Sequence, residues 1–405
     1  MDSGYLILES LIFLFIFMQK IKTILLILGI ILISGFSGII VNRYVFPRLA
    51  VLKFFADYDF IKKATENVTI INKTEQVYIK EDASVNKIVS QVASSVVNIT
   101  SYATMEKATS AGTVPGQVLP ATLKNGTGLI VASDGLVVTY VSAISVGANV
   151  KYKVTLDNGN VHDATFFGVD SYSNLAFLKL NASNLPVASF TNSDDARPGE
   201  KIVAVGNDAR AHTPFFAAGV LSVFDPYYNL SEKAVASSEK LEGTFGVDIS
   251  AQAHYVGGPI VDYSGQIVGI TGMVNRDNKE EFFQIPSNKA KAVIDKAIRK
   301  ELETNCALGI YYVPITKTYA TINNLPSESG ALIYSSSGQQ GLAIIANSPA
   351  AGAGLKINDL IIAVSAEKIE VGKSLPDLLY KYKKGEEIEL TILRNSQELK
   401  IKVQL

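Results

Sequence analysis

The sequence predicts a mainly β chain that begins with a transmembrane helix, and three observations carry this prediction. Thr23 to Val41 contains no charged residue. Residues 97–285 fall into short β-rich runs separated by turns, and the C-terminal hundred residues mix strand and helix patterns. We therefore expect a membrane anchor at 1–46, a stalk at 47–83, a large β domain at 84–304 and a smaller α+β domain at 305–405.

The composition limits the classes of partner and cofactor that this chain can bind. A formal net charge of −1 without a basic run argues against a nucleic-acid partner. The single cysteine, Cys306, excludes an intrachain disulfide and cannot supply a zinc cage, so neither a metal nor another cofactor is expected. We expect Cys306 to have a structural or incidental role, because no histidine lies near it in sequence.

The charge-free stretch is long enough to span a bilayer, which takes about 20 apolar residues. Lys20 and Lys22 precede it and Arg43 follows it, so charge bias is a weak topology signal. A cleaved signal peptide is the alternative. The run is longer than a usual signal core and Ser34 to Ser37 make a poor cleavage site, which favours an uncleaved single-pass anchor in the cell membrane, with the globular part outside the cytoplasm.

A second apolar run occupies residues 5–17 and contains Glu9. It is too short to span comfortably. Either Met18 is the true start of the chain, or this run forms a second, half-embedded helix.

Residues 97–285 predict a barrel or sandwich of many short strands. Turn signals such as Ser133-Asp134-Gly135 separate the runs. A helix over Pro286–Glu303 follows, with apolar residues on one face and lysines on the other. The expected strands are Gly128–Val131, Val137–Val141, Lys153–Leu156, Leu175–Leu180, Ile202–Val205, Gly219–Val223, Gly246–Ile249, Pro259–Val261 and Gln266–Thr271.

Several blocks of this region resemble the HtrA/DegP family, in which a trypsin-like serine protease precedes a PDZ domain. They are Gly126–Thr139, Gly168–Lys179, Pro198–Asn207, Ala253–Val261 and Phe283–Asn288, and their order and spacing agree with the family. The resemblance implies a chymotrypsin-like double β-barrel.

The resemblance also locates three catalytic positions, and each holds a different residue. Ser142 stands at the histidine position, Asn174 at the aspartate position before Leu-Ala, and Val256 at the serine position before Gly-Gly-Pro. Triad catalysis needs a nucleophile, an imidazole base and a carboxylate that orients the base. We therefore expect no catalytic residue here.

The glycine whose N–H lines the family's oxyanion hole is replaced by His254. A β-carbon there disfavours a glycine-type backbone, which weakens the case for residual electrostatic catalysis. The other histidines, His162 and His212, are expected at a strand edge and in a loop. Two interpretations of the cleft stay open: a packed, inert surface, or a recess that binds a peptide without cutting it.

Residues 307–405 resemble the family's PDZ domain. The segment Ser348–Asp359 carries the closest match, with Asn358 where glycine is usual and a left-handed backbone is tolerated. The resemblance places a carboxylate-binding loop and an edge strand for peptide addition after it, with a helix at Ser374–Tyr382 as the other groove wall. The expected peptide-binding residues are Leu308, Gly309, Ile310, Tyr311, Tyr312, Val313, Leu375 and Leu379.

Two functions follow as expectations. The first is a membrane-anchored pseudoprotease that binds C-terminal peptides or unfolded proteins, or acts in envelope protein quality control. It would act as a homotrimer or in a hetero-oligomer with an active relative. The second is a serine endopeptidase that acts through a relocated site or in a hetero-assembly. Val256 discriminates between them, because valine has no hydroxyl to attack a peptide bond.

Overall fold

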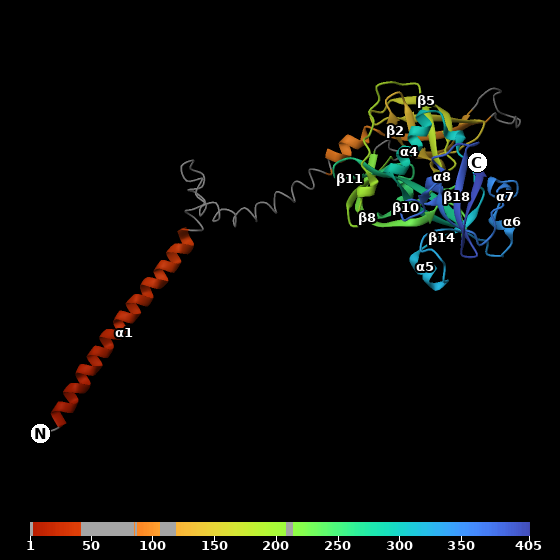
Figure 1. The fold of residues 1–405 in the computed structure, drawn as a ribbon. Coiled ribbons are helices and arrows are strands. Elements are labelled where there is room, and N and C mark those ends of the chain that lie inside the picture. The colour runs from red at the N-terminus through yellow and green to blue at the C-terminus, as the bar shows by residue number, and fades with distance from the viewer. Residues whose placement is uncertain (1–2, 42–84, 86, 106–118, 208–213) are drawn as a thin grey trace. The chain divides into compact units, whose positions relative to one another are not determined.

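The computed structural model describes residues 3–41, 85, 87–105, 119–207 and 214–405 (Figure 1). Contacts divide the chain into two compact units, Met1–Ala83 and Ser84–Leu405. The predicted stalk at 47–83 lies outside the described residues, and so does His212.

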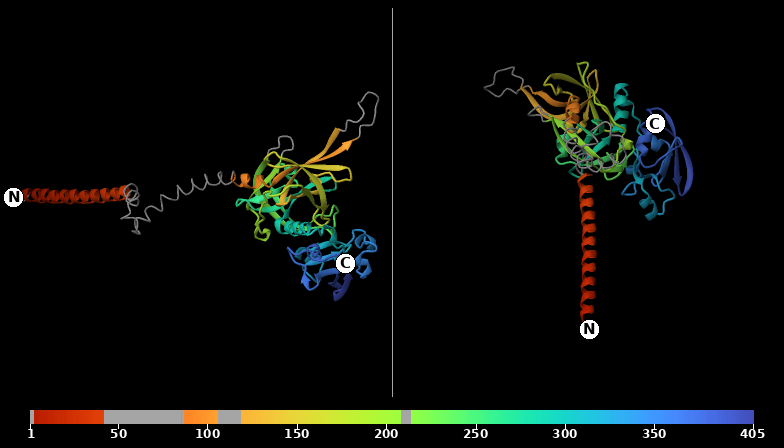
Figure 2. Two further views of the ribbon diagram at one scale, coloured as in Figure 1. Left: turned by 90° about the horizontal axis from the view of Figure 1, so that it is seen from above. Right: turned by 90° about the vertical axis from the view of Figure 1, so that its left-hand side faces the viewer.

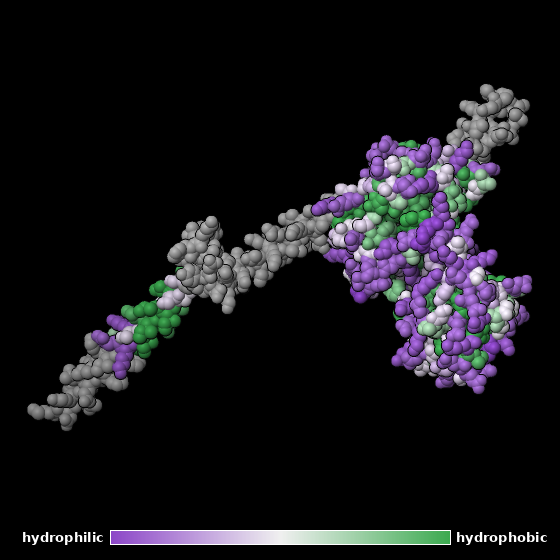
Figure 3. Space-filling model, turned by 45° about the horizontal axis from the view of Figure 1, so that its top comes forward, coloured by the Kyte–Doolittle hydropathy of each residue, from purple (hydrophilic) through white to green (hydrophobic). Residues whose placement is uncertain are grey.

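The first unit contains one long helix, α1 (Ser3–Ile40), of 38 residues. The apolar run at 5–17 is thus the first part of the same helix rather than a separate one. The window Met18–Gly35 is long and apolar enough to cross a membrane. Figure 3 shows a green hydrophobic band along this helix, with hydrophilic side chains on its N-terminal side. At about 1.5 Å per residue the helix is about 57 Å long, which exceeds the roughly 30 Å hydrocarbon core of a bilayer.

After helical residues at 87–93, the second unit forms two closed β-barrels, which confirms the predicted double barrel (Figure 2). The first barrel has the strand order β1-β2-β3-β6-β5-β4, and β1 pairs with β4 to close it. Its strands are β1 (Val96–Met105), β2 (Leu119–Ala132), β3 (Leu136–Tyr140), β4 (Val150–Thr155), β5 (Val161–Val169) and β6 (Leu175–Leu180).

The second barrel has the order β10-β13-β12-β11-β7-β8, closed by the pairing of β10 with β8. Its strands are β7 (Lys201–Asn207), β8 (Pro214–Asn229), β10 (Glu242–Asp248), β11 (Pro259–Asp262), β12 (Ile267–Arg276) and β13 (Lys279–Pro286). Strand β5 carries no fully buried residue and was not predicted, because its exposed positions hide the apolar pattern.

Alternating inward residues fill each barrel, and a third cluster packs between them. Val137, Ile130 and Leu178 lie at the centre of the first barrel, while Ile202, Ile260 and Val268 fill the second. The cluster between the barrels includes Tyr140 and Val256, so the loops at the barrel junction are held by the same apolar contacts as the strands.

The helix after the barrels is α4 (Ser287–Ile298), which is shorter than the predicted span of 286–303. Lys300 adopts a positive φ of 60°, a conformation typical of the residue that ends a helix, and a short 3-10 turn, η5 (Leu302–Thr304), follows. One lysine departs from the predicted exposed face. Lys296 is 8% exposed and its ammonium group lies 3.6 Å from the centre of the Tyr380 ring.

The C-terminal domain is built on a sheet ordered β19-β18-β16-β15-β14-β9, with β17 paired to β16. Its own strands are β14 (Tyr311–Ile315), β15 (Gly330–Ile333), β16 (Leu360–Val364), β17 (Glu367–Lys368), β18 (Glu387–Arg394) and β19 (Gln397–Gln404). Its helices are α5 (Lys317–Ile322), α6 (Gln340–Ala343), α7 (Pro349–Gly352) and α8 (Leu375–Leu379). The remaining strand, β9 (Ala236–Ser237), comes from the loop between β8 and β10 of the second barrel.

Two details agree with the sequence. Asn358 has a φ of 69°, the left-handed conformation expected where glycine is usual. Helix α8 starts with a capping box between Ser374 and Asp377, but it spans five residues rather than the nine of the predicted 374–382 segment.

Candidate functional sites in the barrel cleft and the PDZ groove

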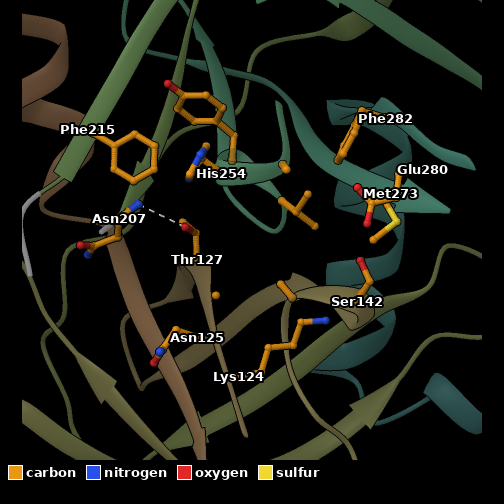
Figure 4. Close-up of a pocket in the computed structure, with 15 residues that line it drawn as sticks. Lys124, Asn125, Thr127, Ser142, Asn207, Phe215, His254, Met273, Glu280 and Phe282 are labelled. Atoms are coloured by element: carbon orange, nitrogen blue, oxygen red, sulfur yellow. Dashed lines mark hydrogen bonds between the residues drawn. The ribbon is translucent and has the colours of Figure 1, made fainter. Parts of the chain in front are cut away.

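A cleft of about 860 Å³ opens between segments of the two barrels (Figure 4). It brings Ser142, which follows β3, together with His254 and Val256, which share one loop more than a hundred residues later. The residues that line it are Lys124, Asn125, Gly126, Thr127, Ser142, Ala143, Asn207, Phe215, Ala253, His254, Tyr255, Val256, Met273, Glu280 and Phe282.

Ser142 lies in a 3-10 turn, η2 (Val141–Ala143), directly after β3. Its hydroxyl oxygen is buried and has no hydrogen-bond partner among the described residues. A neutral hydroxyl cannot take a proton from a nucleophile near pH 7, so this position offers no general base.

Asn174 lies beside Ser142 in space, because the Val141 N–H donates to the Asn174 carbonyl oxygen at 3.0 Å. Both polar atoms of its side chain are bonded. The Nδ2 group donates to the Tyr140 hydroxyl at 3.2 Å, and Oδ1 accepts from the Lys240 ammonium at 2.8 Å. Burial lowers the pKa of Lys240. The Asn174 amide thus links the barrel junction to the β8–β10 loop.

Val256 is 8% exposed and packs in the apolar cluster between the barrels. The two glycines that follow it are required by close packing. A Cβ on Gly257 would lie 2.4 Å from the Thr127 carbonyl oxygen, and one on Gly258 would lie 2.3 Å from that of Val205. The Gly-Gly-Pro motif therefore fixes the loop between the barrels whatever residue precedes it.

His254 lies in the 3-10 turn η4 (Gln252–Tyr255), and its N–H donates to the Ala251 carbonyl oxygen at 3.0 Å. An oxyanion hole needs this N–H free to point at the developing charge. Ala251 has a φ of 54°, an uncommon conformation for a residue other than glycine, so the strained backbone lies three residues before the histidine. The imidazole ring packs edge-on against Phe215, with 5.7 Å between ring centres.

The second predicted site also comes together. Leu308 and Ile310 are fully buried, and Gly309 between them has a φ of 82°. The predicted edge strand Tyr311–Val313 lies within β14. Opposite the loop, Leu379 and Pro376 of α8 line a recess of about 70 Å³, whereas Leu375, 1% exposed, lies in the domain core.

The groove already has an occupant that the sequence did not predict. Strand β9 pairs antiparallel with β14, matching Tyr311 with Ser237 and Tyr312 with Ala236. Ser238 and Glu239 line the same recess as Leu379. No sequence pattern indicated that this segment would pair with β14, because Ala-Ser-Ser-Glu is typical of an ordinary polar loop.

Two carboxylates join the barrels to the C-terminal domain, the buried Glu242 and the half-buried Asp377. Glu242, 3% exposed, accepts from the Tyr312 hydroxyl at 2.6 Å, and burial raises the pKa of its carboxyl group to about 8. Asp377 accepts from the Lys289 ammonium at 2.9 Å through both oxygens, and from the Tyr172 hydroxyl. These contacts tie β14 to β10 of the second barrel, and α8 to α4 and to the segment between β5 and β6 of the first barrel.

A third carboxylate, the buried Asp170, reaches the C-terminal domain from the first barrel. It accepts from the Asn305 amide at 2.6 Å and from the Tyr380 hydroxyl at 3.1 Å. Burial raises the pKa of Tyr380, so the phenol stays protonated. The Cys306 thiol lies nearby and donates to the Leu379 carbonyl at 3.3 Å, and burial raises its pKa, which does not favour a reactive thiolate.

Comparison with known proteins agrees with this architecture. Residues 126–270 match the trypsin-like peptidase domain, and residues 307–405 match the PDZ domain. The DegP-like probable periplasmic serine endoprotease of Brucella suis is 30% identical over 294 residues, covering 71% of this chain and 53% of the relative. A DegP-like protein of the same description from Chlamydia trachomatis is 29% identical over 281 residues, covering 69% and 53%. The chain thus spans about half the length of these curated relatives.

The fold is also similar to solved structures. The HtrA-type protease AlgW with decapeptide aligns with a TM-score of 0.59 at 21% identity, covering 78% of this chain and 96% of that one. AlgW with tripeptide gives the same TM-score at 22% identity, covering 78% and 95%. A trypsin-like domain followed by a PDZ domain, the DegP-like relatives and the shared fold together support the assignment of this chain to the HtrA family.

Proposed function

We propose that this protein is a membrane-anchored HtrA-like pseudoprotease, which binds polypeptides through its PDZ groove and does not cut them. The residue at position 256 carries the proposal. Valine has no nucleophilic atom. His254 and Glu280 both line the cleft, but no hydrogen bond joins them in the described part of the chain, and the His254 N–H is bonded to the Ala251 carbonyl oxygen. Loss of any one of these parts lowers triad catalysis by orders of magnitude.

A peptidase assay tests this proposal. The chain should not hydrolyse a permanently unfolded, carboxymethylated protein, and a serine-directed fluorophosphonate should not label it. The triple variant Ser142→His, Asn174→Asp, Val256→Ser serves as the comparison. Turnover by the wild-type chain that persists after repurification and is abolished by Ser142→Ala would establish the alternative, an endopeptidase with a relocated site.

Peptide binding is the positive half of the proposal. The backbone N–H groups of Gly309 and Ile310 lie just before β14, in the place where PDZ domains bind a chain-terminal carboxylate, and they are bonded to Glu239 and Ser238 in this structure. A peptide with a free carboxyl terminus should bind with a Kd on the order of micromolar, since strand addition buries little area and orders the peptide. The same peptide with an amidated terminus should bind at least tenfold more weakly. Equal affinities would reject carboxylate recognition.

The barrel cleft is a second candidate binding site. Its polar lining includes two atoms without a partner in the described part of the chain, Ser142 Oγ and Asn207 Oδ1. Ser142→Trp would fill the cleft, and we expect it to weaken binding of the carboxymethylated, unfolded protein. Ser183→Trp places the same side chain on an exposed position and should not weaken binding. Equal binding by both variants would assign the cleft to the inert, packed interpretation.

Helix α1 would hold the protein in the membrane with residues 84–405 on the outer side. The apolar window in α1 and the periplasmic description of the relatives support this placement. A homotrimer, or a hetero-oligomer with an active relative, would bring several grooves together and is tested by the mass of the detergent-solubilised assembly.

A further inference from the structure

The segment Val235–Glu239 of the second barrel lies in the PDZ groove as a peptide ligand would. It runs antiparallel to β14, the strand that follows the carboxylate-binding loop. The Ser238 N–H donates to the Ile310 carbonyl oxygen at 3.1 Å, which continues the pairing beyond β9 towards that loop. Ala236, Ser237 and Ser238 are all less than 9% exposed, so the segment is packed into the groove rather than lying across its rim.

A carboxylate occupies the end of the groove. Glu239 Oε1 accepts from the Gly309 N–H at 2.7 Å, and the Ser238 hydroxyl accepts from the Ile310 N–H at 3.2 Å. These N–H groups are the donors that a free chain terminus would need. The side-chain carboxylate of Glu239 therefore stands where the terminal carboxylate of an external peptide would stand.

The barrel holds this segment in shape. Asn229, at the end of β8, donates to the carbonyl oxygens of Ser237 and Lys240 and accepts from the N–H groups of Ser231 and Ser237. At the groove side, the Lys233 ammonium lies 4.1 Å from the centre of the Tyr311 ring and donates to its hydroxyl. A segment shaped before it docks loses little conformational freedom, which favours docking.

We propose that Val235–Glu239 is a built-in ligand of the PDZ groove, and that external C-terminal peptides bind only by displacing it. This inference rests on the proposed peptide-binding function of the same groove. The apparent Kd of an external peptide equals its intrinsic Kd divided by the fraction of molecules whose groove is open. Weakening the internal contact should therefore tighten external binding.

Displacement of Val235–Glu239 from the groove would also change contacts at the barrel junction. Lys240 follows the docked segment directly, and its ammonium group bonds to the Asn174 side chain and to the Ser171 carbonyl oxygen. Asn174 in turn bonds to the Tyr140 hydroxyl and the Val141 N–H, directly before Ser142 of the cleft. A peptide that pulls Val235–Glu239 out of the groove would move the residue that anchors the aspartate position.

The first experiment measures competition on the full-length chain in detergent. The probe is a fluorescein-labelled peptide of residues 231–238, Ser-Glu-Lys-Ala-Val-Ala-Ser-Ser, with a free carboxyl terminus that takes the place of the Glu239 side chain. Glu239→Ala removes a charge-assisted hydrogen bond, and we expect about tenfold tighter binding of the probe. Glu232→Ala makes the same chemical change at an exposed position of the same loop and should leave the Kd unchanged.

The second experiment locks the segment in place. Ser237→Cys and Tyr311→Cys stand directly opposite each other in the β9–β14 pair, in a Cys306→Ser background. Opposed residues in antiparallel strands have Cα atoms about 4.5–5.5 Å apart, which suits a disulfide. Mild oxidation should cross-link this pair and abolish probe binding until a reductant is added. Tyr311→Cys with exposed Ser183→Cys should not cross-link.

The outcomes separate the two proposals. Failure of the opposed pair to cross-link, or equal probe affinity of wild type and Glu239→Ala, overturns the built-in ligand. A different outcome is that the cross-link forms readily while neither the reduced chain nor the Glu239→Ala variant binds any free-carboxyl peptide. That result supports internal occupancy of the groove and rejects the proposed external ligand.

Discussion

Glu242 offers a direct test of how the barrels and the PDZ domain are joined, through the variant Glu242→Gln. Its carboxyl group is 3% exposed and bonded to the Tyr312 hydroxyl, and burial raises its pKa from 4.5 to about 8. Between these two pH values the unfolded chain has released a proton that the folded chain still holds. Stability from this group is therefore complete below about pH 4.5 and is lost as the pH rises towards 8.

The magnitude follows from linkage. Each pH unit between the two pKa values removes about 1.4 kcal/mol from the free energy of unfolding, so the full loss between pH 4.5 and 8 is at most roughly 5 kcal/mol. Glutamine keeps the shape and an acceptor for the Tyr312 hydroxyl but does not titrate. We expect the Gln variant to gain stability relative to wild type steadily from pH 5 to pH 8.

Thermal unfolding followed by far-UV circular dichroism suits this chain, which has no tryptophan. Glu370→Gln, on an exposed position of the PDZ domain, is the matched control and should follow the wild-type pH profile. Parallel profiles for wild type and Glu242→Gln over this range would refute the reasoning, because they would show that Glu242 titrates alike in the folded and unfolded chains.

Three further predictions concern the groove, the PDZ core and the membrane. Gly309→Val should destabilise the domain by more than about 1 kcal/mol and abolish peptide binding, because the residue has a φ of 82° and its Cβ would lie 2.3 Å from that of Ser348; unchanged melting would count against it. Arg394→Met should cost about 3 kcal/mol in urea unfolding, since it strands the buried Asp359 carboxylate that Arg394 binds through two nitrogens; a loss below 1 kcal/mol would contradict this. The full chain should stay with membranes through an alkaline carbonate wash, and its release as a shortened soluble form would indicate a cleaved signal peptide.

The sequence predicted the parts of this molecule that depend on local pattern. Strands such as β3 and β6 are short, almost continuously buried apolar runs between turns, and Gly257 and Gly258 mark the loop at the barrel junction because only glycine fits there. The positions of Ser142 and Val256 followed from these motifs. The left-handed Asn358 followed from its place in the PDZ segment.

The parts that escaped prediction depend on contacts between distant segments. Glu239 and Gly309 are seventy residues apart, and nothing local in an Ala-Ser-Ser-Glu loop indicates a place in another domain's sheet. Lys296 was expected on the exposed face of α4, yet it is buried. The Asn305 side chain and the Tyr380 carbonyl oxygen accept hydrogen bonds from its ammonium group, and the Tyr380 ring covers it. Such contacts form only when the domains pack against each other, so no local sequence pattern predicts them.

The pairing of β9 with β14 has a consequence for solubility. A free sheet edge is a template for strands of other chains, and proteins protect such edges. At the opposite edge of the PDZ sheet, β19 carries the exposed lysines Lys400 and Lys402, which discourage edge-to-edge association. On the β14 side, the two residues of β9 cover the edge instead. When these two residues leave the groove, β14 becomes an unpaired sheet edge that can associate with other copies of the chain. A peptide that binds there would therefore protect this edge as well as act as a ligand.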